Sequence, residues 1–365
     1  MNKLIFKILT ILDRCQEPIP SGHIARRLSL QGFDLSERTV RHHLKMLDQK
    51  GYTEHRKKRG RRITEKGRQE LSNSFVCERV GFIINKINNL SFLTDFNPRT
   101  LLGKVILNVT YVREETAAKA LSVMSAVLHS PYAFSNRVII KKGGECIGDL
   151  TVPGGMVGIG TVCSITLNGI LLKERIPAES KFGGIVSVKK NIPRNFTSFI
   201  GYEKSSVAPL EFFLKGKMTN VLKTLVHSDG EVLGSLREIP ETCLNDAKRV
   251  CKLLSNNAIG GAILLGQPSQ PFLGMPVTTG KVGMVILGGL NPLAALGEAG
   301  ISADSHSMDT ICEYDDMVPV EEFVGISCAD EHIPRGSARV SCGEMYSSRV
   351  PFGKQYQPKD RVFPG

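Results

Sequence analysis

The sequence predicts a mixed α/β protein (α+β), in which an N-terminal winged helix-turn-helix is followed by an internally duplicated α/β domain. Three observations support this fold class. The first 70 residues have the spacing of three amphipathic helices followed by a basic hairpin. From residue 103 onward, a strand, a helix and a strand follow one another twice. Each pass contains a glycine-rich stretch, at residues 153–170 and again at 276–290.

Length and cysteine content limit the class of protein. A chain of 365 residues favours two or three domains. The nine cysteines form no Cys-x-x-Cys pair, so free thiols in a reducing cytoplasm are expected. No apolar run is long enough to span a membrane, and the first residues lack the pattern of a secretory signal. We therefore expect a cytoplasmic protein with no membrane partner.

Positive charge is concentrated near the N-terminus. The formal net charge is +12, and residues 1–75 hold 17 Lys and Arg against 8 Asp and Glu. The remaining residues hold 30 and 27, which leaves the rest of the chain nearly neutral. A basic segment joined to a neutral body indicates a polyanionic partner at that end, and nucleic acid is the first candidate. The alternative is a basic domain that is simply well solvated.

Apolar spacing predicts three helices before the hairpin. The first lies within residues 2–15 and ends before Pro18. Ser21 is expected to cap the second helix and Ser36 the third, because a serine hydroxyl accepts a hydrogen bond from a free N–H of the first turn. Gly51 ends the third helix. Two short strands then follow, joined by a basic tip.

Three helices followed by a basic hairpin form a winged helix, whose third helix enters the major groove while the wing contacts phosphates. RNA is the competing polyanion, because some ribonucleases carry a similar winged helix. Tyr52 is the only aromatic residue of the wing, so no stacking platform for single strands is visible. We therefore expect double-stranded DNA, in contact with these residues of the third helix and the wing: Ser36, Arg38, Thr39, Arg41, His42, Lys45, Arg56, Lys57, Lys58, Arg59, Arg61 and Arg62.

The composition divides the chain into four segments. Residues 1–70 form the winged helix, and residues 71–97 form a linker helix. Residues 98–330 form the duplicated domain, with units at about 103–215 and 229–330, and the segment from 196 to 218 joins the two units. The match of Leu167-Asn168-Gly169-Ile170 with Leu287-Gly288-Gly289-Leu290 supports the duplication. Residues 331–365 are rich in Pro, Gly and Ser, and we expect a flexible tail.

The glycine-rich stretches do not form a nucleotide-binding motif. No Gly-Lys-Ser/Thr closes them, and Cys163 occupies the place of the third glycine in Gly-x-Gly-x-x-Gly. Cys163 has no histidine near it in the sequence, and no histidine spacing indicates a metal site. Asp304, His306 and Asp309 lie close together, but a solvated loop explains them. We expect no catalytic residues, no metal and no cofactor.

Glycines beside hydroxyls and a lysine suit a different task, the binding of a small carboxylate or phosphate by backbone N–H groups. The alternative is that the glycines allow strands and helices to pack closely. Arg113, Lys173 and Arg237 could add positive charge. The candidate ligand-binding residues are Gly154, Gly155, Gly158, Gly160, Thr161, Ser164, Thr278, Thr279 and Lys281.

The chain resembles the NrpR family of nitrogen-regulatory repressors. The resemblance rests on residues 36–44 (SERTVRHHL), 152–164 (VPGGMVGIGTVCS) and 282–292 (VGMVILGGLNP). It covers the winged helix and one regulatory domain, whereas some members carry two. It implies a homodimer that represses nitrogen-assimilation genes and releases its operator when 2-oxoglutarate binds. Two alternatives stay open: an RNA-binding accessory protein, or an enzyme with an accessory winged helix.

Overall fold

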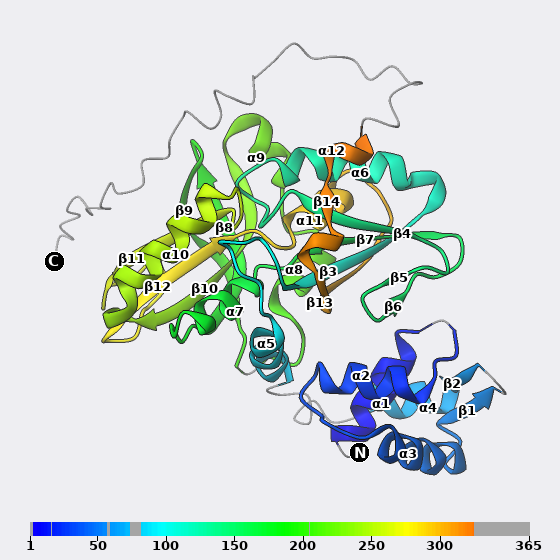
Figure 1. Cartoon of the computed structure of the whole chain (residues 1–365). Coiled ribbons are helices and arrows are strands. Elements are labelled where there is room, and N and C mark those ends of the chain that lie inside the picture. The colour runs from blue at the N-terminus through cyan, green and yellow to red at the C-terminus, as the bar shows by residue number, and fades with distance from the viewer. Residues whose placement is uncertain (1–2, 16, 57–58, 74–81, 204, 325–365) are drawn as a thin grey trace. The chain divides into compact units, whose positions relative to one another are not determined.

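The computed structural model describes residues 3–15, 17–56, 59–73, 82–203 and 205–324 (Figure 1). They form a winged helix at the N-terminal end, followed by an α/β body. The predicted tail lies outside the described residues, as does part of the predicted linker helix. Among the described helices, none combines the length and the apolar composition that a bilayer crossing requires.

The winged helix has the predicted order of elements. Its apolar core joins one face of each of the first three helices to the second strand of the wing, through Ile8, Ile24, Leu44 and Ile63. The elements are α1 (Lys3–Asp13), α2 (Ser21–Ser29), α3 (Glu37–Gln49), β1 (Thr53–Arg56), β2 (Gly60–Ile63) and α4 (Glu65–Asn73).

The two predicted serine caps differ in the structure. The Ser36 hydroxyl accepts a hydrogen bond from the Thr39 backbone N–H at 3.2 Å, as expected of a cap. Ser21 is instead the first residue of α2, and its hydroxyl donates to Glu37 Oε1 at 2.8 Å. The prediction for Ser21 was therefore wrong, because Pro20 occupies the cap position and Ser21 links α2 to α3.

The body contains two five-stranded antiparallel sheets (Figure 1). The first has the order β13-β3-β7-β4-β14, with bounds Asp304–Glu313, Lys104–Arg113, Met156–Val162, Arg137–Lys142 and Val318–Pro319. The second has the order β11-β12-β10-β8-β9, with bounds Ala262–Pro268, Lys281–Leu287, Gly230–Pro240, Glu179–Lys189 and Ile192–Gly201. A small hairpin, β5 (Cys146–Ile147) and β6 (Leu150–Thr151), precedes β7.

The same strand order appears twice in these sheets. We call β3 to β9 the first repeat and β10 to β13 the second repeat. The order β4-β7-β3-β13 of one sheet corresponds to β11-β12-β10-β8 of the other. The last strand of each series comes from the other repeat, since β8 pairs with β10 and β13 pairs with β3. The two repeats therefore exchange strands, and the residues from 196 to 201 continue β9 rather than act as a connector.

Helices cover the sheets in two separate cores. One core contains α6 (Glu114–Leu128), α11 (Asn291–Glu298), α8 (Pro209–Lys215) and α9 (Val221–His227). The other contains α10 (Leu244–Asn256) and α7 (Thr166–Lys173), and α5 (Phe82–Leu93) packs against α7. The short helix α12 (Glu321–Val324) contacts α6.

The alignment of the repeats corrects one sequence match. Val162 ends β7 as Leu287 ends β12, and a short turn leads each strand into α7 or α11. Leu287 therefore corresponds to Val162, whereas the sequence paired it with Leu167, which lies inside α7. The pairing failed because Gly169 is a helix residue packed on Thr94, while Gly289 is a turn residue with φ +81°.

Candidate functional site

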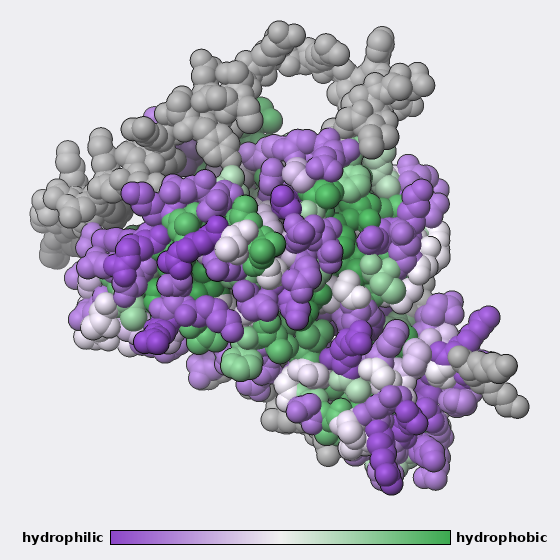
Figure 2. All heavy atoms as spheres, viewed as in Figure 1, coloured by the Kyte–Doolittle hydropathy of each residue, from purple (hydrophilic) through white to green (hydrophobic). Residues whose placement is uncertain are grey.

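The third helix of the winged helix presents a polar face. Figure 2 shows hydrophilic side chains over this helix, whose apolar stripe is buried in the core. The exposed residues include Arg38, Arg41, His42 and Lys45, all four predicted to contact DNA. Glu37 holds the Arg41 guanidinium at 2.7 Å along the helix. Ser36 and Thr39 share a hydrogen bond at 2.9 Å, so these two residues order the start of the helix.

The wing residues divide into two kinds. Arg61 is mostly buried, and its guanidinium lies 2.9 Å from Asp48 at the end of α3, so it fixes the wing to the recognition helix. Arg56 and Arg62 both pair with Glu54. Arg59 lies exposed at the tip. Lys57 and Lys58 lie outside the described residues.

The wing turns at a position that requires glycine. Gly60 has φ +110°, and a Cβ there would lie 2.1 Å from the Ile19 carbonyl oxygen. The backbone of Arg61 exchanges two hydrogen bonds of 2.9 Å with Ile19. The segment before α2 therefore pairs with the wing like a third strand. This pairing holds the wing at a fixed place beside the recognition helix.

The predicted ligand-binding residues fall at three levels of two strands. The lowest level is the turn before each strand: Gly154 and Gly155 before β7, and Thr278, Thr279 and Lys281 at the start of β12. Gly155 and Gly280 have φ +74° and +78°, and their carbonyls accept hydrogen bonds from the N–H groups of Glu114 and Glu241. These turns are equivalent in the two repeats but belong to two different sheets.

The charge of Lys281 is already engaged. Its Nζ lies 2.5 Å from Glu179 and 4.0 Å from Glu238. The hydrogen bond from Lys281 is the main reason why the pKa of Glu179 lies below its ordinary value. Thr278 is also bound, since its N–H donates to Glu238 Oε1 at 2.9 Å. The structure does not bring this group together with Ser164 at the far end of β7.

The middle level contains glycines that lie under neighbouring side chains. A Cβ at Gly158 would lie 2.8 Å from Val152 Cγ2, and one at Gly160 would lie 2.6 Å from Ile139 Cγ2. At Gly283, the equivalent of Gly158, the nearest atom is Val277 Cγ2 at 3.0 Å. These contacts fit the packing alternative that the sequence left open, because a covering loop crosses each strand here.

The upper level is the place where the repeats meet. A Cβ at Gly289, after β12, would lie 3.1 Å from the Ser164 hydroxyl, after β7. A cavity of about 20 Å³ lies here, which is room for about one water molecule. We call it the junction cavity. It is lined by Asn108, Cys163, Ser164, Ile165, Tyr202, Ala208, Leu210, Gly289, Leu290, Ser307 and Met308.

Arg237 lies directly behind one wall of this cavity. It is fully buried on β10, and its guanidinium donates to the Ser164 carbonyl at 3.2 Å, to the Ser235 hydroxyl at 2.8 Å and to the Asn168 side-chain carbonyl. The other two cations named from the sequence lie elsewhere: Arg113 is exposed beside Glu115, and Lys173 lies over the Phe92 ring. The sequence signal that could have singled out Arg237 was its position within the apolar strand β10.

The groups around Arg237 are neutral. Burial lowers the pKa of Arg237 to about 10, which still leaves it charged at neutral pH. Burial also raises the pKa of the Cys163 thiol and of the Tyr202 hydroxyl. Cys163 is therefore a protonated, buried thiol and lacks the activation that a nucleophile requires.

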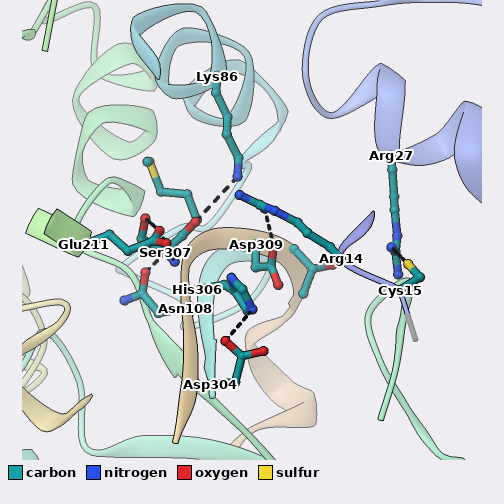
Figure 3. A network of polar contacts seen from close by, with 12 residues as sticks. Arg14, Cys15, Arg27, Lys86, Asn108, Glu211, Asp304, His306, Ser307 and Asp309 are labelled. Carbon is teal, nitrogen blue, oxygen red and sulfur yellow. Dashed lines mark hydrogen bonds and ion pairs between the residues drawn. The ribbon is translucent and has the colours of Figure 1, made fainter. Parts of the chain in front are cut away.

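A bulge of β13 forms another wall of the junction cavity, and Figure 3 shows its side chains beside Asn108, Glu211 and Arg14. The register shifts between His306 and Thr310, and Ser307 donates to Glu211 from both its N–H and its hydroxyl. The Met308 N–H donates to Asn108 Oδ1 at 3.1 Å. Asp309 lies 3.4 Å from Arg14 of the winged helix. The bulge therefore lines the cavity and also contacts Arg14, the residue that follows α1.

The other candidate sites carry less chemistry. The Asp304 carboxylate lies 3.1 Å from His306 Nε2, while Asp309 turns to Arg14. Over the described part of the chain, no three His, Cys, Asp or Glu residues gather as metal ligands would. A larger open hollow of about 320 Å³ lies beside the wing, but its arginines are already paired: Arg62 with Glu54, and Arg68 with Asp13 and Glu65.

Two family models match the chain. A model described as NrpR regulatory domains NRD1 and 2 matches residues 80–319, which is more than half of the chain. A model described as the ribonuclease R winged-helix domain matches residues 6–71. The two matches correspond to the α/β body and to the winged helix.

Relatives with curated names match over most of the chain. The global nitrogen regulator NrpRI of Methanosarcina mazei is 32% identical over 87% of this chain and 98% of that protein. The global nitrogen regulator NrpR of Methanococcus maripaludis is 30% identical over 82% of this chain, but over only 52% of that protein. The chain thus spans about half the length of the second relative.

A solved structure shares the fold of the body. The crystal structure of a nitrogen repressor-like protein from Methanococcus jannaschii superposes with a TM-score of 0.55 at 22% identity. The match covers 65% of this chain and 98% of that one. At this identity the likeness concerns the fold alone.

Proposed function

Because the chain belongs to the NrpR family of nitrogen regulators, we propose that it represses nitrogen-assimilation genes and that 2-oxoglutarate, or a related small carboxylate, relieves its binding to DNA. The observation that carries the DNA-binding part is α3. It is capped by Ser36, and its exposed face holds Arg38, Arg41, His42 and Lys45. A helix of this kind beside a wing fits the major groove of duplex DNA.

The junction cavity supports the effector part of the proposal. Residues of both repeats line it, so a ligand there would contact both. Its volume of about 20 Å³ is too small for a five-carbon acid, so binding requires the walls to separate. A ligand that binds only the opened state shifts the population towards that state. The bulge that carries Asp309 is one of those walls, and its contact with Arg14 offers a path to the winged helix.

We expect a cytoplasmic homodimer that is not an enzyme. Two winged helices related by a twofold axis match a palindromic operator. The edge strand β9 exposes Ile192 and Phe199, and Phe212 of α8 is also exposed, which supports an apolar contact between two copies. The six cysteines in the described part of the chain are free thiols, which suits a reducing compartment.

The test is a gel-shift titration of the full chain on the DNA upstream of its own gene, with and without millimolar 2-oxoglutarate. We expect a specific complex that the ligand weakens. A complex unchanged by the ligand would remove the effector from the proposal and leave the DNA binding intact. Single-stranded RNA serves as the competitor, because the winged-helix match names a ribonuclease. Tighter binding to that RNA than to duplex DNA would favour the RNA-binding alternative.

Two arginines on the winged helix separate base reading from phosphate contact. Arg41→Ala should weaken binding to the operator by about 1–3 kcal/mol and leave non-specific binding largely unchanged. Arg59→Ala at the wing tip should weaken binding to all sequences and lower the salt slope by about one. Equal losses on operator and random DNA for both variants would contradict this division. Circular dichroism checks that both variants are folded.

A further inference from the structure

Arg237 is a buried charge for which the described part of the chain supplies no ion pair. Its hydrogen-bond acceptors in the described part of the chain are two carbonyl oxygens and a hydroxyl, all neutral. Taking a guanidinium out of water costs several kcal/mol unless an opposite charge or a full set of hydrogen bonds compensates. A guanidinium has five N–H donors, so these three bonds do not use its full capacity.

We propose that Arg237 is the receptor for one carboxylate of a small dianionic ligand that enters the junction cavity. The inference rests on the proposed effector role and assigns it a site. Ser164 lines the cavity and accepts a hydrogen bond from Arg237, so a ligand at this wall lies one residue away from the guanidinium. Opening the cavity at Ser164 exposes the charge to the ligand. Arginine binds carboxylates through two parallel N–H groups, which is stronger than a neutral hydrogen bond.

A second buried group points to a polar ligand at the same place. The hydroxyl of Thr161 is buried and has no hydrogen-bond partner in the described part of the chain. Thr161 lies opposite Asn108 on the neighbouring strand, and residues opposite one another in an antiparallel pair share one face of the sheet. Asn108 lines the junction cavity. An unpaired hydroxyl therefore lies on the sheet face of a cavity-lining residue, and separation of the walls would let it bond a ligand oxygen.

The equivalent position in the first repeat shows that the fold itself does not require an arginine. Thr110 occupies it on β3, as the pairing of β3 with β7 and of β10 with β12 shows. Thr110 lies opposite Ser305, and their hydroxyls share a hydrogen bond of 2.7 Å. Arg237 lies opposite Ser180 in the same way. Two hydroxyls fill this site in one repeat, so the cation in the other is an addition to the shared scaffold.

The chemistry limits the class of ligand. One full negative charge is required to balance Arg237. The wall offers the neutral hydroxyl of Ser164, and the hydroxyl of Thr161 lies behind it on the same sheet face as Asn108. A second acid group suits the part of the ligand that reaches water as the walls separate. Small dicarboxylates with a carbonyl or hydroxyl oxygen between the acid groups fit this arrangement, and neutral esters of the same acids do not.

The experiment measures the thermal stabilisation of the full chain by 2-oxoglutarate, glutarate and the neutral dimethyl ester of 2-oxoglutarate. We compare the wild type with Arg237→Met, Arg237→Lys and the matched control Thr110→Val. The wild type and Thr110→Val should be stabilised by the acids and not by the ester. The apparent Kd from the same titrations should rise about tenfold or more in Arg237→Met, because a charge-assisted hydrogen bond is lost. The apparent Kd of Arg237→Lys should lie between those of the wild type and Arg237→Met.

The outcomes separate this inference from the proposed function. If the wild type and Arg237→Met are stabilised equally by the acids, a receptor role for Arg237 is excluded while the effector proposal stands. If no acid stabilises the wild type, the effector proposal fails together with the site. If Arg237→Met does not fold, Arg237→Lys decides: an unchanged Kd in a folded Arg237→Lys protein, with equal response to acid and ester, excludes the carboxylate receptor.

Discussion

The two repeats of the body form hydrogen bonds to each other through different side chains. Asn108 of the first repeat donates to the carbonyl of Gly289, after β12, at 3.0 Å. Arg237 of the second repeat donates to the carbonyl of Ser164, after β7, at 3.2 Å. Gly289 and Ser164 are equivalent turn residues. The shared fold thus places a neutral side chain, Asn108, against one turn and a cation, Arg237, against the other. The duplication accounts for the common backbone, and the difference between these two side chains accounts for the proposed ligand binding.

The largest expected loss of stability concerns the glycine packing that the two repeats share. Valine at Gly158 or at Gly283 would place atoms within about 3 Å of a covering side chain, Val152 or Val277. Overpacking of this kind costs about 1–3 kcal/mol. We expect both variants to lose stability in that range, measured by urea unfolding. Gly154→Ala is the control, because its added Cβ meets nothing within 4 Å. If valine at one of the two sites leaves the free energy of unfolding unchanged, the two repeats are not packed alike.

The next effect is the difference in stability between removing the neutral Asn108 side chain and removing the charged Arg237 side chain. Asn108→Ala leaves the Gly289 carbonyl and the Met308 N–H without their partner inside the core, which should cost about 1–3 kcal/mol of unfolding free energy. Arg237→Met also loses hydrogen bonds, but it removes the desolvation cost of a buried cation. Without ligand, Arg237→Met should therefore lose less stability than Asn108→Ala in thermal unfolding. The reverse order would make Arg237 a structural residue.

The smallest effect concerns Lys281, at the far end of β12. It pairs with Glu179 of β8 and Glu238 of β10, whereas Met156 occupies the equivalent position at the start of β7. Lys281→Met should lower the unfolding free energy by less than about 1 kcal/mol, since the Glu179 side chain is 54% exposed and Lys181 still pairs with both glutamates. The affinity for 2-oxoglutarate should stay within about twofold. A loss of ligand binding would move the site to the turns before β7 and β12.

The same variant has a predictable pH dependence. The pKa of Glu179 lies below its ordinary value, first because of the hydrogen bond from Lys281. A depressed carboxyl pKa contributes stability above the pKa of the unfolded chain and loses it as the pH falls through the folded pKa. The wild type should therefore lose more stability than Lys281→Met when the pH falls from about 6 to about 3. Urea unfolding at the two pH values measures the difference.

The sequence predicts the local elements better than the tertiary relations between them. The Ser36 cap, the basic face of α3, and the first strand, the helix and the second strand of each repeat follow from spacing and residue type, which are local properties. The glycine-rich stretches that contain β7 and β12 were not predicted as strands. The exchange of β8 and β13 depends on pairing between distant segments, and no local pattern records it. For the same reason, the sequence could name Arg237 as a possible positive charge but could not separate it from Arg113, which is exposed.

The ligand-binding candidates illustrate the same limit. Glycines mark places where another chain segment comes close, but the sequence does not say whether a ligand or a side chain approaches. At Gly158 and Gly160 the neighbours are side chains of the same body. Thr161 and Ser164 lie near the junction cavity because β7 ends where the second repeat meets the first, which only the tertiary fold determines.

The role of Arg237 in the release of DNA is measured by the fraction of operator DNA bound, titrated with 2-oxoglutarate, for the wild type and for Arg237→Met. We expect the wild type to release the DNA as the ligand concentration rises, whereas Arg237→Met should bind the DNA equally well and keep it at ligand concentrations about tenfold higher. Release of both proteins at the same ligand concentration, or of neither, would contradict this expectation.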